Sequence, residues 1–407
     1  MPYDVDRIRA RFPALAEGAA HFDGPGGSQV PDVVGEAVAR TLTSAISNRG
    51  TLTASERRAD GVVRDGRRAL ADLLAADPRG IVFGRSATAL TYDLARALAK
   101  GWHAGDEVVV TRLDHDSNIR PWLQVAAAVG AAVRWVDFDP ATTELEVEAV
   151  RAEVTDRTRL VATTAASNLV GTRPDTAAIS AVAHEVGALH WVDGVHATPH
   201  GAVDLGAVGA DVWTCSPYKF LGPHCGVLAA SPALLETLHP DKLLPSSDAV
   251  PERFELGTLP YELMAGTTAA VDFLAGLDDL DTPVTPDDRR ARLEASMAAL
   301  HGHEAALLDV LEQGLRSMPG VTVYSNAARR TPTLLLTVEG LAVGDVARGL
   351  AERGVNAPAS HFYAIEASRR LGLGDTGGVR LGLAPYTSRD DVDRVLSALD
   401  ELTRTAA

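Results

Sequence analysis

Cysteine is scarce in this sequence: its 407 residues include only Cys215 and Cys225, too few for a disulfide framework or a zinc site built from cysteines alone. Basic residues are also in the minority, with 38 Lys and Arg against 54 Asp and Glu. The net charge of −16 argues against a general attraction to nucleic acid or to anionic membranes. No apolar run approaches the roughly 18 residues of a membrane span. What remains is an ordinary globular protein, since 46% of its residues are hydrophobic.

The chain length allows two or three domain-sized units. Its first residues, MPYDVDRIRARF, place charges where a signal peptide would have its apolar stretch. We therefore expect a cytoplasmic enzyme with no membrane or nucleic-acid partner.

Lysine is the other rare residue, because only Lys100, Lys219 and Lys242 are lysines among the 38 basic residues. Lys219 follows an apolar strand and lies among turn-forming residues. Lys100 closes a predicted helix, where a cation complements the helix dipole, and Lys242 adjoins no strand or helix end. A lysine beside a strand is most often a surface residue. The functional alternative for such a residue is a Schiff-base lysine, whose amine must be neutral to attack an aldehyde. Lys219 is the best candidate of the three lysines for this role.

Short apolar runs alternate with helical segments from about residue 80 to residue 240. The runs that predict strands are 81–84, 107–111, 132–138, 159–166, 189–194, 211–216 and 226–230, with helices expected at 88–100, 118–129 and 176–186. This alternation predicts an α/β fold whose large, mostly parallel sheet of seven strands is covered by helices on both faces. In such sheets the ligand site lies beyond the carboxyl ends of the strands, so we expect the chemistry in the loops that follow them.

The Pro- and Asp-rich segment 278–288 predicts a break in the chain. A long helix is expected over 289–318, then strands near 321–325, 333–338 and 378–384, and helices near 343–353 and from 389 onward. This mixture predicts a smaller α+β domain. We expect an N-terminal arm at 1–20, a large domain at 21–280 and a small C-terminal domain at 281–407.

Polar residues follow three of the predicted strands. Asp193 ends one strand. Three interpretations of it are open: a helix cap, a metal ligand, or the acid that keeps a cofactor ring protonated. His115 follows a second strand, and it is a metal ligand together with Asp114 and Asp116, a surface loop residue or a flat platform for a cofactor ring. Asn168 follows a third, where it can cap a helix or hydrogen-bond a ring hydroxyl.

The segment 81–88 runs from a strand through a turn of small residues into a helix. Such a turn offers free backbone N–H groups and the positive end of the helix dipole to a phosphate. Ser86 is equally suited to be a plain helix N-cap, which is the commoner meaning of such a sequence.

Taken together and in this order, these segments resemble the class V aminotransferase family of pyridoxal-phosphate enzymes, in particular its cysteine-desulfurase-like branch. The likeness runs from about His21 to Leu402 and includes the opening segment HFDGPGGSQVP at 21–31. It implies the fold of aspartate aminotransferase, pyridoxal 5′-phosphate as the cofactor, no metal, and an amino acid as the substrate.

The resemblance also assigns the catalytic residues. Lys219 corresponds to the lysine that binds the cofactor, Asp193 to the acid on its pyridine nitrogen, and His115 to the imidazole stacked on its ring. Arg380, in GVRLGLAPY, corresponds to the arginine that holds the substrate carboxylate. By itself Arg380 would be interpreted as a strand residue with a salt-bridge partner.

Further cofactor contacts follow from the same resemblance. Asn168 and His196 correspond to the residues that face the ring's phenolic oxygen. Thr258, in RFELGT, corresponds to a threonine lent to the phosphate of the partner subunit, which implies a homodimer with shared active sites. The remaining implied phosphate contacts are Ala87, Thr88, Ser216 and Tyr218.

One departure from the family pattern bears on the reaction. Cysteine desulfurases carry a nucleophilic cysteine on a loop of the small domain, and in the corresponding segment 357–364 that position is Tyr363. Cys215 and Cys225 flank Lys219 on predicted strands, where packing in the core is the expected role. A persulfide relay needs an accessible thiolate on a mobile loop. The sequence therefore predicts a C–S lyase that works by β-elimination through a Cα carbanion, without a persulfide cysteine.

Three alternatives stay open. The first is a class V aminotransferase or an amino-acid epimerase, and His361 and Tyr363, which we expect at the substrate, would then supply the deciding acid or base. The second is a non-catalytic binding protein with this fold. The third is a metal hydrolase that uses Asp193 with the acidic and histidine residues at 114–116, which explains neither Lys219 nor the phosphate-like turn.

Overall fold

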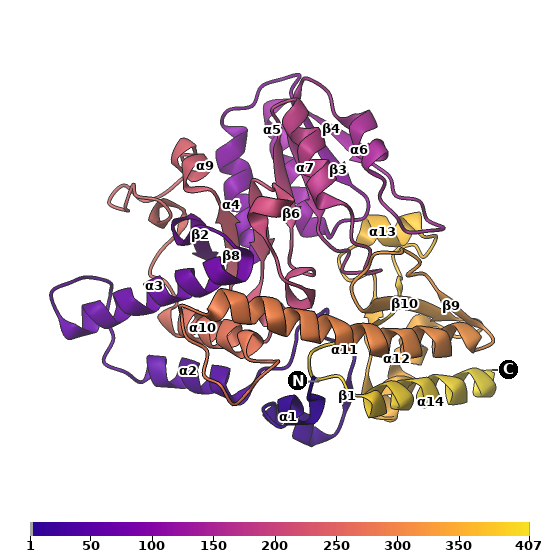
Figure 1. The fold of residues 1–407 in the computed structure, drawn as a ribbon. Coiled ribbons are helices and arrows are strands. Elements are labelled where there is room, and N and C mark those ends of the chain that lie inside the picture. Colours follow the sequence, from indigo (N-terminus) through magenta and orange to yellow (C-terminus); the bar gives the residue numbers. More distant parts are fainter. Residues whose placement is uncertain (1–2, 407) are drawn as a thin grey trace.

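The larger sheet of the molecule has seven strands. The computed structural model describes residues 3–406, and Figure 1 shows this sheet above the long helices. In spatial order its strands are β2 (Ile81–Gly84), β8 (Gly226–Ala230), β7 (Val212–Cys215), β6 (Leu189–Asp193), β5 (Thr158–Thr164), β3 (Glu107–Thr111) and β4 (Ala132–Val136). β8 is antiparallel to both its neighbours, and the other neighbouring pairs are parallel. The predicted α/β fold with a large, mostly parallel sheet is confirmed.

Helices cover both faces of this sheet because alternate residues of its strands point to opposite sides. Phe83 and Val227 belong to one buried core, with residues of α3 (Ala54–Leu74) and α10 (Tyr261–Ala275). Their chain neighbours Val82 and Leu228 belong to another, with residues of α4 (Ala87–Ala99) and α5 (Arg120–Val129). The remaining helices of this part are α2 (Asp32–Leu42), α6 (Val147–Glu153), α7 (Thr176–Glu185), α8 (Leu205–Val208) and α9 (Pro232–Thr237).

Two strands of the large sheet end two residues earlier than predicted. β4 stops at Val136 and β5 at Thr164, whereas their apolar runs continue to residues 138 and 166. After β5 the Thr164 hydroxyl bonds both the carbonyl (2.7 Å) and the N–H (3.2 Å) of Ala166, which closes a turn. The apolar side chain of Ala166 stays buried, but its backbone has left the ladder. Burial without strand pairing explains why the hydrophobic run overshoots the strand.

The smaller sheet is antiparallel and lies near the C-terminus of the chain. Its strands are β12 (Ala359–Ser360), β13 (Gly378–Gly382), β10 (Thr333–Val338) and β9 (Val321–Val323). The long helix α11 (Arg289–Ser317), α12 (Val343–Glu352) and α14 (Arg389–Ala406) pack against it (Figure 1), and α13 (Ile365–Arg370) follows β12. The fold is therefore an α/β sheet unit combined with a smaller α+β unit.

Two segments join these units. α11 has Leu293 in the core of the large sheet and Leu311 in the core of the small one. At the N-terminus, α1 (Val5–Arg9) places Ile8 in the large core, whereas β1 (Ala20–His21) pairs in parallel with β11 (Val355–Asn356) of the C-terminal part. The division of the chain at residues 20 and 280 stays a prediction.

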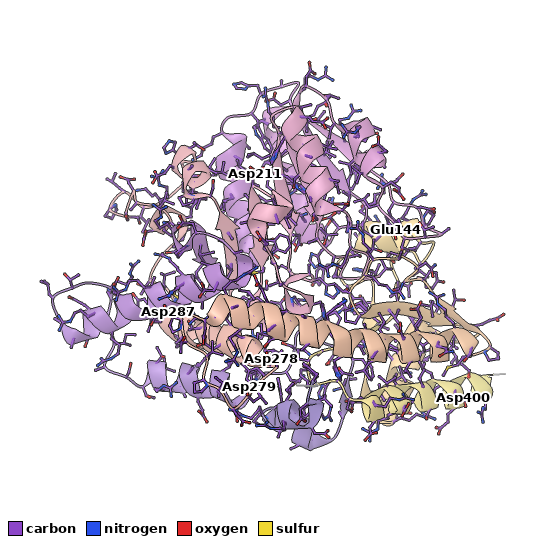
Figure 2. All side chains as sticks on the ribbon, viewed as in Figure 1. Glu144, Asp211, Asp278, Asp279, Asp287 and Asp400 are labelled. Carbon is purple, nitrogen blue, oxygen red and sulfur yellow. The ribbon has the colours of Figure 1, made fainter. Side chains whose placement is uncertain are left out.

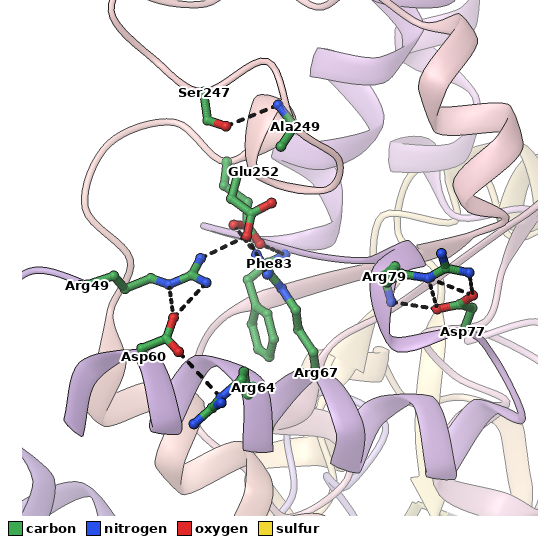
Figure 3. Close-up of polar contacts among 11 residues, drawn as sticks. Arg49, Asp60, Arg64, Arg67, Asp77, Arg79, Phe83, Ser247, Ala249 and Glu252 are labelled. Carbon is green, nitrogen blue, oxygen red and sulfur yellow. Dashed lines mark hydrogen bonds and ion pairs between the residues drawn. The ribbon is translucent and has the colours of Figure 1, made fainter. Parts of the chain in front are cut away.

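A cluster of arginines ties α3 to the segment that leads to Thr258 (Figure 3). Arg67 donates to Glu252 Oε1 at 2.7 Å and to Glu255 Oε2 at 2.6 Å, and Arg49 also donates to Glu252 at 2.8 Å. Removing one partner of a buried ion pair leaves an uncompensated charge, so these contacts are costly to break. The cluster fixes the course of the chain just before Thr258.

The acidic side chains labelled in Figure 2 are distributed over both parts of the molecule. Asp211 lies beside the large sheet, whereas Asp400 lies on α14 beside the small one. Among residues 3–406, no helix is both long enough and apolar enough to cross a membrane.

Candidate active site

The carboxyl ends of the parallel strands open into a cavity of about 640 Å³, which the segment 360–363 and β13 border from the other side. A narrower recess of about 70 Å³ continues from it toward the sheet. The two share six lining residues: Thr88, His115, Ser117, Asn168, Tyr218 and Lys219. The recess adds Ser86, Ala87, Asp193, His196 and Ser216, and the cavity adds Arg380 and Tyr363.

Lys219 lies in the short turn that follows β7 and reaches into this cavity. Its Nζ donates to the carbonyl of Pro25 and lies 5.3 Å from the centre of the Tyr218 ring. Burial lowers the pKa of Lys219 to about 7, and the positive charge of Arg380 adds to the shift, while Asp193 opposes it. The amine is therefore available in its neutral, nucleophilic form near neutral pH.

The other two lysines lie outside the cavity. Lys100 pairs with Asp241 at 2.7 Å, and Lys242 pairs with Asp248 at 3.0 Å. Lys219 is thus the lysine that the fold brings to the strand ends.

Asp193 is the last residue of β6 and is buried in the recess. Its Oδ1 accepts from the N–H of Val195 at 2.9 Å. The next residue must be glycine, because a Cβ on Gly194 would lie 2.0 Å from the Trp213 ring. Burial raises the pKa of Asp193 to about 6, and the charge of Lys219 partly opposes this shift. A buried carboxylate with little competing hydrogen bonding suits a cationic partner such as a protonated ring nitrogen.

His115 presents a neutral, flat ring to the cavity. Its Nδ1 lies 2.8 Å from the Ser117 hydroxyl and accepts from the Ser117 N–H at 3.0 Å, which fixes the ring orientation. The ring stacks on Tyr363 with centres 5.5 Å apart. Burial lowers the pKa of His115 to about 4, and the charge of Lys219 contributes. The imidazole can therefore cover a cofactor ring without carrying a charge.

Asp114 supports the turn that carries His115. The fully buried carboxyl group accepts from the Asn118 amide at 2.7 Å and from the Thr111 hydroxyl. Burial raises the pKa of Asp114 to about 8. The fold therefore favours the protonated form of this carboxyl group.

This pKa makes the stability of the apoprotein depend on pH. A carboxyl group whose folded pKa is raised stabilises the fold most at low pH, and that contribution is lost as the pH rises from about 4 through about 8. Asp114→Asn keeps the shape of the protonated group. We expect the variant to melt about 2–4 °C above the parent at pH 9 and with it at pH 5. Melting curves at both pH values measure this, and a parallel decline of both proteins with pH would contradict it.

The turn between β2 and α4 has the form of a phosphate site. Ser86 caps α4, since its Oγ accepts from the N–H of Ala89 at 3.1 Å. The turn lies so close to β8 that a Cβ on Gly226 would meet the carbonyl carbon of Ser86 at 2.1 Å. The first N–H groups of a helix have no partner inside the helix and attract anions. Ala87 and Thr88 begin this helix and line the recess.

Two buried polar atoms of the recess residues have no partner among the described residues. Asn168 donates its amide to the carbonyl of Phe362 at 2.9 Å, and this leaves its Oδ1 unpaired. His196 uses Nε2 for the hydroxyls of Thr331 and Thr333, both at 3.0 Å, which leaves Nδ1 unpaired. Burial lowers the pKa of His196 well below its usual value, so the ring is neutral. Because buried polar atoms are normally paired, these orphans fit a bound polar ring.

Arg380 extends from β13 toward the cavity and is only 2% exposed. Its Nη1 donates to the carbonyl of Asn168 at 2.7 Å, and the guanidinium lies 3.7 Å from the centre of the Phe362 ring. Burial lowers the pKa of Arg380 to about 9, while the charge of Asp23 opposes this shift. Its Nε is buried without a partner, so the side chain keeps donor capacity for a carboxylate.

Two of the expected site residues line neither the cavity nor the recess. His361 lies beside it, where its Nδ1 accepts from the N–H of Tyr363 at 3.1 Å, and this local bond turns the ring back on its own loop. Thr258 lines a separate groove with Phe254 and Leu256. Within residues 3–406, no three His, Cys, Asp or Glu side chains form a group that could hold a metal, so the metal-hydrolase alternative has no ligand set.

Several cavity residues were not among the predicted site residues. They are Pro25, Tyr92, Arg120 and Phe362, together with Asp116, whose predicted role was that of a metal ligand. Arg120 begins the helix after the His115 loop, so its position beside a predicted site was a usable signal. Phe362 lies between His361 and Tyr363 on the loop that the resemblance places at the substrate, but its contact with Arg380 depends on how the two sheets meet.

The fold and the cavity suit an enzyme that binds a phosphorylated ring cofactor. The sequence model of the aminotransferase class-V family matches residues 20–395, and the chain belongs to this family. Enzymes of this family depend on pyridoxal 5′-phosphate, which is the cofactor of this chain.

Individual relatives are named for more than one reaction. An aminotransferase-like protein of Gibberella zeae is 32% identical and covers 98% of both chains. A probable cysteine desulfurase of Pseudomonas aeruginosa is 31% identical over 96% of both chains. The crystal structure of the cysteine desulfurase CsdA of Escherichia coli superposes with a TM-score of 0.86 at 26% identity, covering 100% of both chains. The family is therefore established, whereas the particular reaction has to be argued from the site.

Proposed function

We propose that the protein is a pyridoxal-phosphate-dependent C–S lyase that cleaves cysteine-type amino acids by β-elimination and uses no persulfide cysteine. The observation that carries this proposal is the position of its only two cysteines. Cys215 and Cys225 are buried in the core of the large sheet, and neither lines the cavity. Burial raises the pKa of both thiols, that of Cys225 to about 11, so neither has the low-pKa thiolate of a relay. β-Elimination needs no such thiol.

Each site residue has a role in this reaction. When bound, pyridoxal 5′-phosphate withdraws electrons from the substrate Cα and so makes its proton acidic. The neutral Nζ of Lys219 takes that proton, and the Cβ–S bond breaks as the sulfur leaves with the bond electrons. Asp193 would hold a proton on the ring nitrogen, and His115 would cover one face of the ring. Arg380 binds the substrate carboxylate and thereby orients the bond that breaks.

The remaining assignments concern the cofactor's edges. The N-terminus of α4 at Ala87 and Thr88 would hold the phosphate, with Ser216 and Tyr218 beside it. Asn168 and His196 would face the ring oxygen with their unpaired atoms. Water then converts the product of elimination to pyruvate and ammonia, and the sulfur is released as a thiol.

The second candidate is an aminotransferase or an epimerase, and a relative named aminotransferase-like favours it. Both reactions also begin with proton loss at Cα, and they differ in where the proton returns. Tyr363 lines the cavity on the loop 360–363 and would be the acid or base that decides.

Product analysis distinguishes these reactions. The holoenzyme is incubated with cysteine and S-alkyl cysteines, and pyruvate, ammonia and the released sulfur product are measured, which is sulfide from cysteine and a thiol from an S-alkyl cysteine. Equal amounts of pyruvate and of that sulfur product are expected. If neither appears while deuterium from the solvent enters at Cα, the protein is an epimerase or aminotransferase and not a lyase.

We also propose that the enzyme is a cytoplasmic homodimer with shared active sites. Thr258 lies outside the cavity of its own chain, in keeping with a residue lent to the partner's phosphate. Thr258→Val should weaken cofactor binding about tenfold through the loss of one hydrogen bond to a charged group, without changing the fold. Titration of the apoenzyme with cofactor measures this, and an unchanged affinity would contradict the shared site.

A further inference from the structure

The outer part of the cavity is lined by an ion pair that the proposed reaction does not use. Arg120 and Asp116 come from the loop and helix that follow His115. Nη2 of Arg120 lies 2.8 Å from Oδ1 of Asp116, and Nε lies 3.3 Å from Oδ2. Both side chains are partly buried, at 39% and 28% exposure. The pair shares the cavity with Lys219 and Arg380.

An arginine–aspartate pair four residues apart commonly contributes little and reflects only local helix geometry. This pair differs in its position, because Asp116 is tied to the opposite wall of the cavity. The N–H of Asp116 donates to the carbonyl of Tyr363 at 2.8 Å. The pair is therefore held against the loop 360–363, which also carries the Phe362 ring beneath Arg380. This arrangement sets the two charges at a fixed place relative to the substrate-carboxylate site.

The pair still has capacity for a ligand. Arg120 uses Nε and Nη2 for Asp116, and among the described residues Nη1 makes no hydrogen bond. Each oxygen of Asp116 can accept a second hydrogen bond. A carboxylate placed at Nη1 and an ammonium placed at Asp116 would together produce alternating charges. A group that carries both charges fits this pair better than an anion or a cation alone, since each single charge would meet repulsion from one member.

Hydroxyl groups also line the cavity that contains the pair. The hydroxyl-bearing residues Tyr92, Ser117, Ser360 and Tyr363 line the same cavity. An S-alkyl chain would have to displace water from these hydroxyls without replacing its hydrogen bonds, which costs free energy. The cavity of about 640 Å³ lies within the size range of ligand sites, and the cofactor and the substrate would share it.

We propose that Arg120 and Asp116 form a distal subsite for a substrate whose sulfur links two amino acids, so that one amino-acid head lies at Arg380 and Lys219 and the other at this ion pair. The inference rests on the proposed C–S lyase function and names its substrate class. In the reaction the Cα–H bond and the Cβ–S bond of the near half break. The far half leaves with its sulfur as a thiolate, or as a persulfide when the link is a disulfide. Lys219 receives the Cα proton.

The test compares two thioethers that break the same kind of bond. Lanthionine carries a second amino-acid head on its sulfur, whereas S-propylcysteine carries an uncharged chain of similar length. Arg120→Gln should lower kcat/KM for lanthionine about ten- to hundredfold, mainly through KM, since it removes a hydrogen bond between charged groups. For S-propylcysteine the change should stay within about twofold. Asp116→Asn should act in the same direction, and Arg120→Lys should restore part of the loss.

Arg79→Gln is the matched control. Arg79 forms a comparable bidentate pair with Asp77 on the surface, away from the cavity (Figure 3). Its substitution should leave kcat/KM unchanged for both thioethers. An equal loss for both thioethers in Arg120→Gln would show that the pair only supports the His115 loop and would overturn the subsite.

Binding separates this inference from the function on which it rests. If the holoenzyme eliminates from neither thioether, the lyase function fails. The affinities of the two thioethers, measured by calorimetry, then test the subsite. If lanthionine binds more tightly than S-propylcysteine and Arg120→Gln removes this difference, the subsite is supported. Equal affinities for the two thioethers refute it.

Discussion

Lys219→Ala is expected to reduce turnover of every amino-acid substrate by about 10²–10⁴-fold, because it removes the group that moves the Cα proton. The structure leaves no substitute amine, since Lys100 and Lys242 are engaged outside the cavity. The burial that lowers the pKa of Lys219 to about 7 also makes it the lysine best prepared to bind an aldehyde. Turnover and the mass of the borohydride-reduced protein are the two measurements. The reduced cofactor should be attached at residue 219 in the parent and be absent from the variant.

Lys100→Ala is the control for this experiment. It removes an exposed lysine with one ion pair and should retain both the covalent cofactor and the activity. A reducible adduct that persists in Lys219→Ala would show that another amine holds the cofactor and that the central assignment is wrong.

The sheet could be predicted from the sequence because burial on both faces leaves a plain signal. Val82 and Phe83 are both buried, in cores on opposite faces of the sheet, so the run of apolar residues marks the strand. The same signal predicted the end of β5 wrongly. Ala166 is equally buried, but it lies in a turn closed by Thr164 and is not part of the strand. Apolar runs report burial, and the strand boundaries depend on hydrogen bonds that composition does not encode.

The inner part of the site could be predicted for a topological reason. Asp193 and Lys219 end neighbouring strands, and parallel strands bring their carboxyl ends to one edge of the sheet. Asn168 and His115 follow the next strands and reach the same recess. For these residues, chain order together with the sheet rule was enough to place them side by side.

Residue patterns alone could not predict the outer part of the site, because it forms where the small sheet meets the large one. Arg380 and Tyr363 were placed there by the resemblance. Phe362 and Tyr363 have φ angles of +49° and +60°, a left-handed conformation that non-glycine residues rarely adopt. The contacts that hold this loop come from distant segments: the Asn168 amide and the Asp116 N–H. The same conformation turns His361 away from the cavity that it was expected to line. The residues of the loop itself therefore predict neither its left-handed conformation nor the distant contacts that stabilise it.

Arg380→Gln is expected to raise KM for amino-acid substrates and to lower kcat/KM about ten- to hundredfold, because a charge-assisted contact to the carboxylate is lost. A second effect follows from the cavity's electrostatics. The positive charge of Arg380 helps to lower the pKa of Lys219, so its removal should raise that pKa. Once the substrate has displaced Lys219 from the cofactor, less of its amine is then neutral near pH 7, so the rising limb of kcat against pH should move to higher pH.

Arg380→Lys separates the two effects of this substitution. It keeps the positive charge near Lys219 but loses the planar fork that holds a carboxylate with two hydrogen bonds. KM should therefore rise as in Arg380→Gln, while the rising limb of the pH profile should stay near that of the parent. Because Nη1 of Arg380 also donates to the Asn168 carbonyl, melting curves must accompany the kinetics to confirm that both variants remain folded. A pH limb that is identical in all three proteins would mean that the charge of Arg380 does not reach Lys219. An unchanged KM in both variants would place the substrate carboxylate elsewhere.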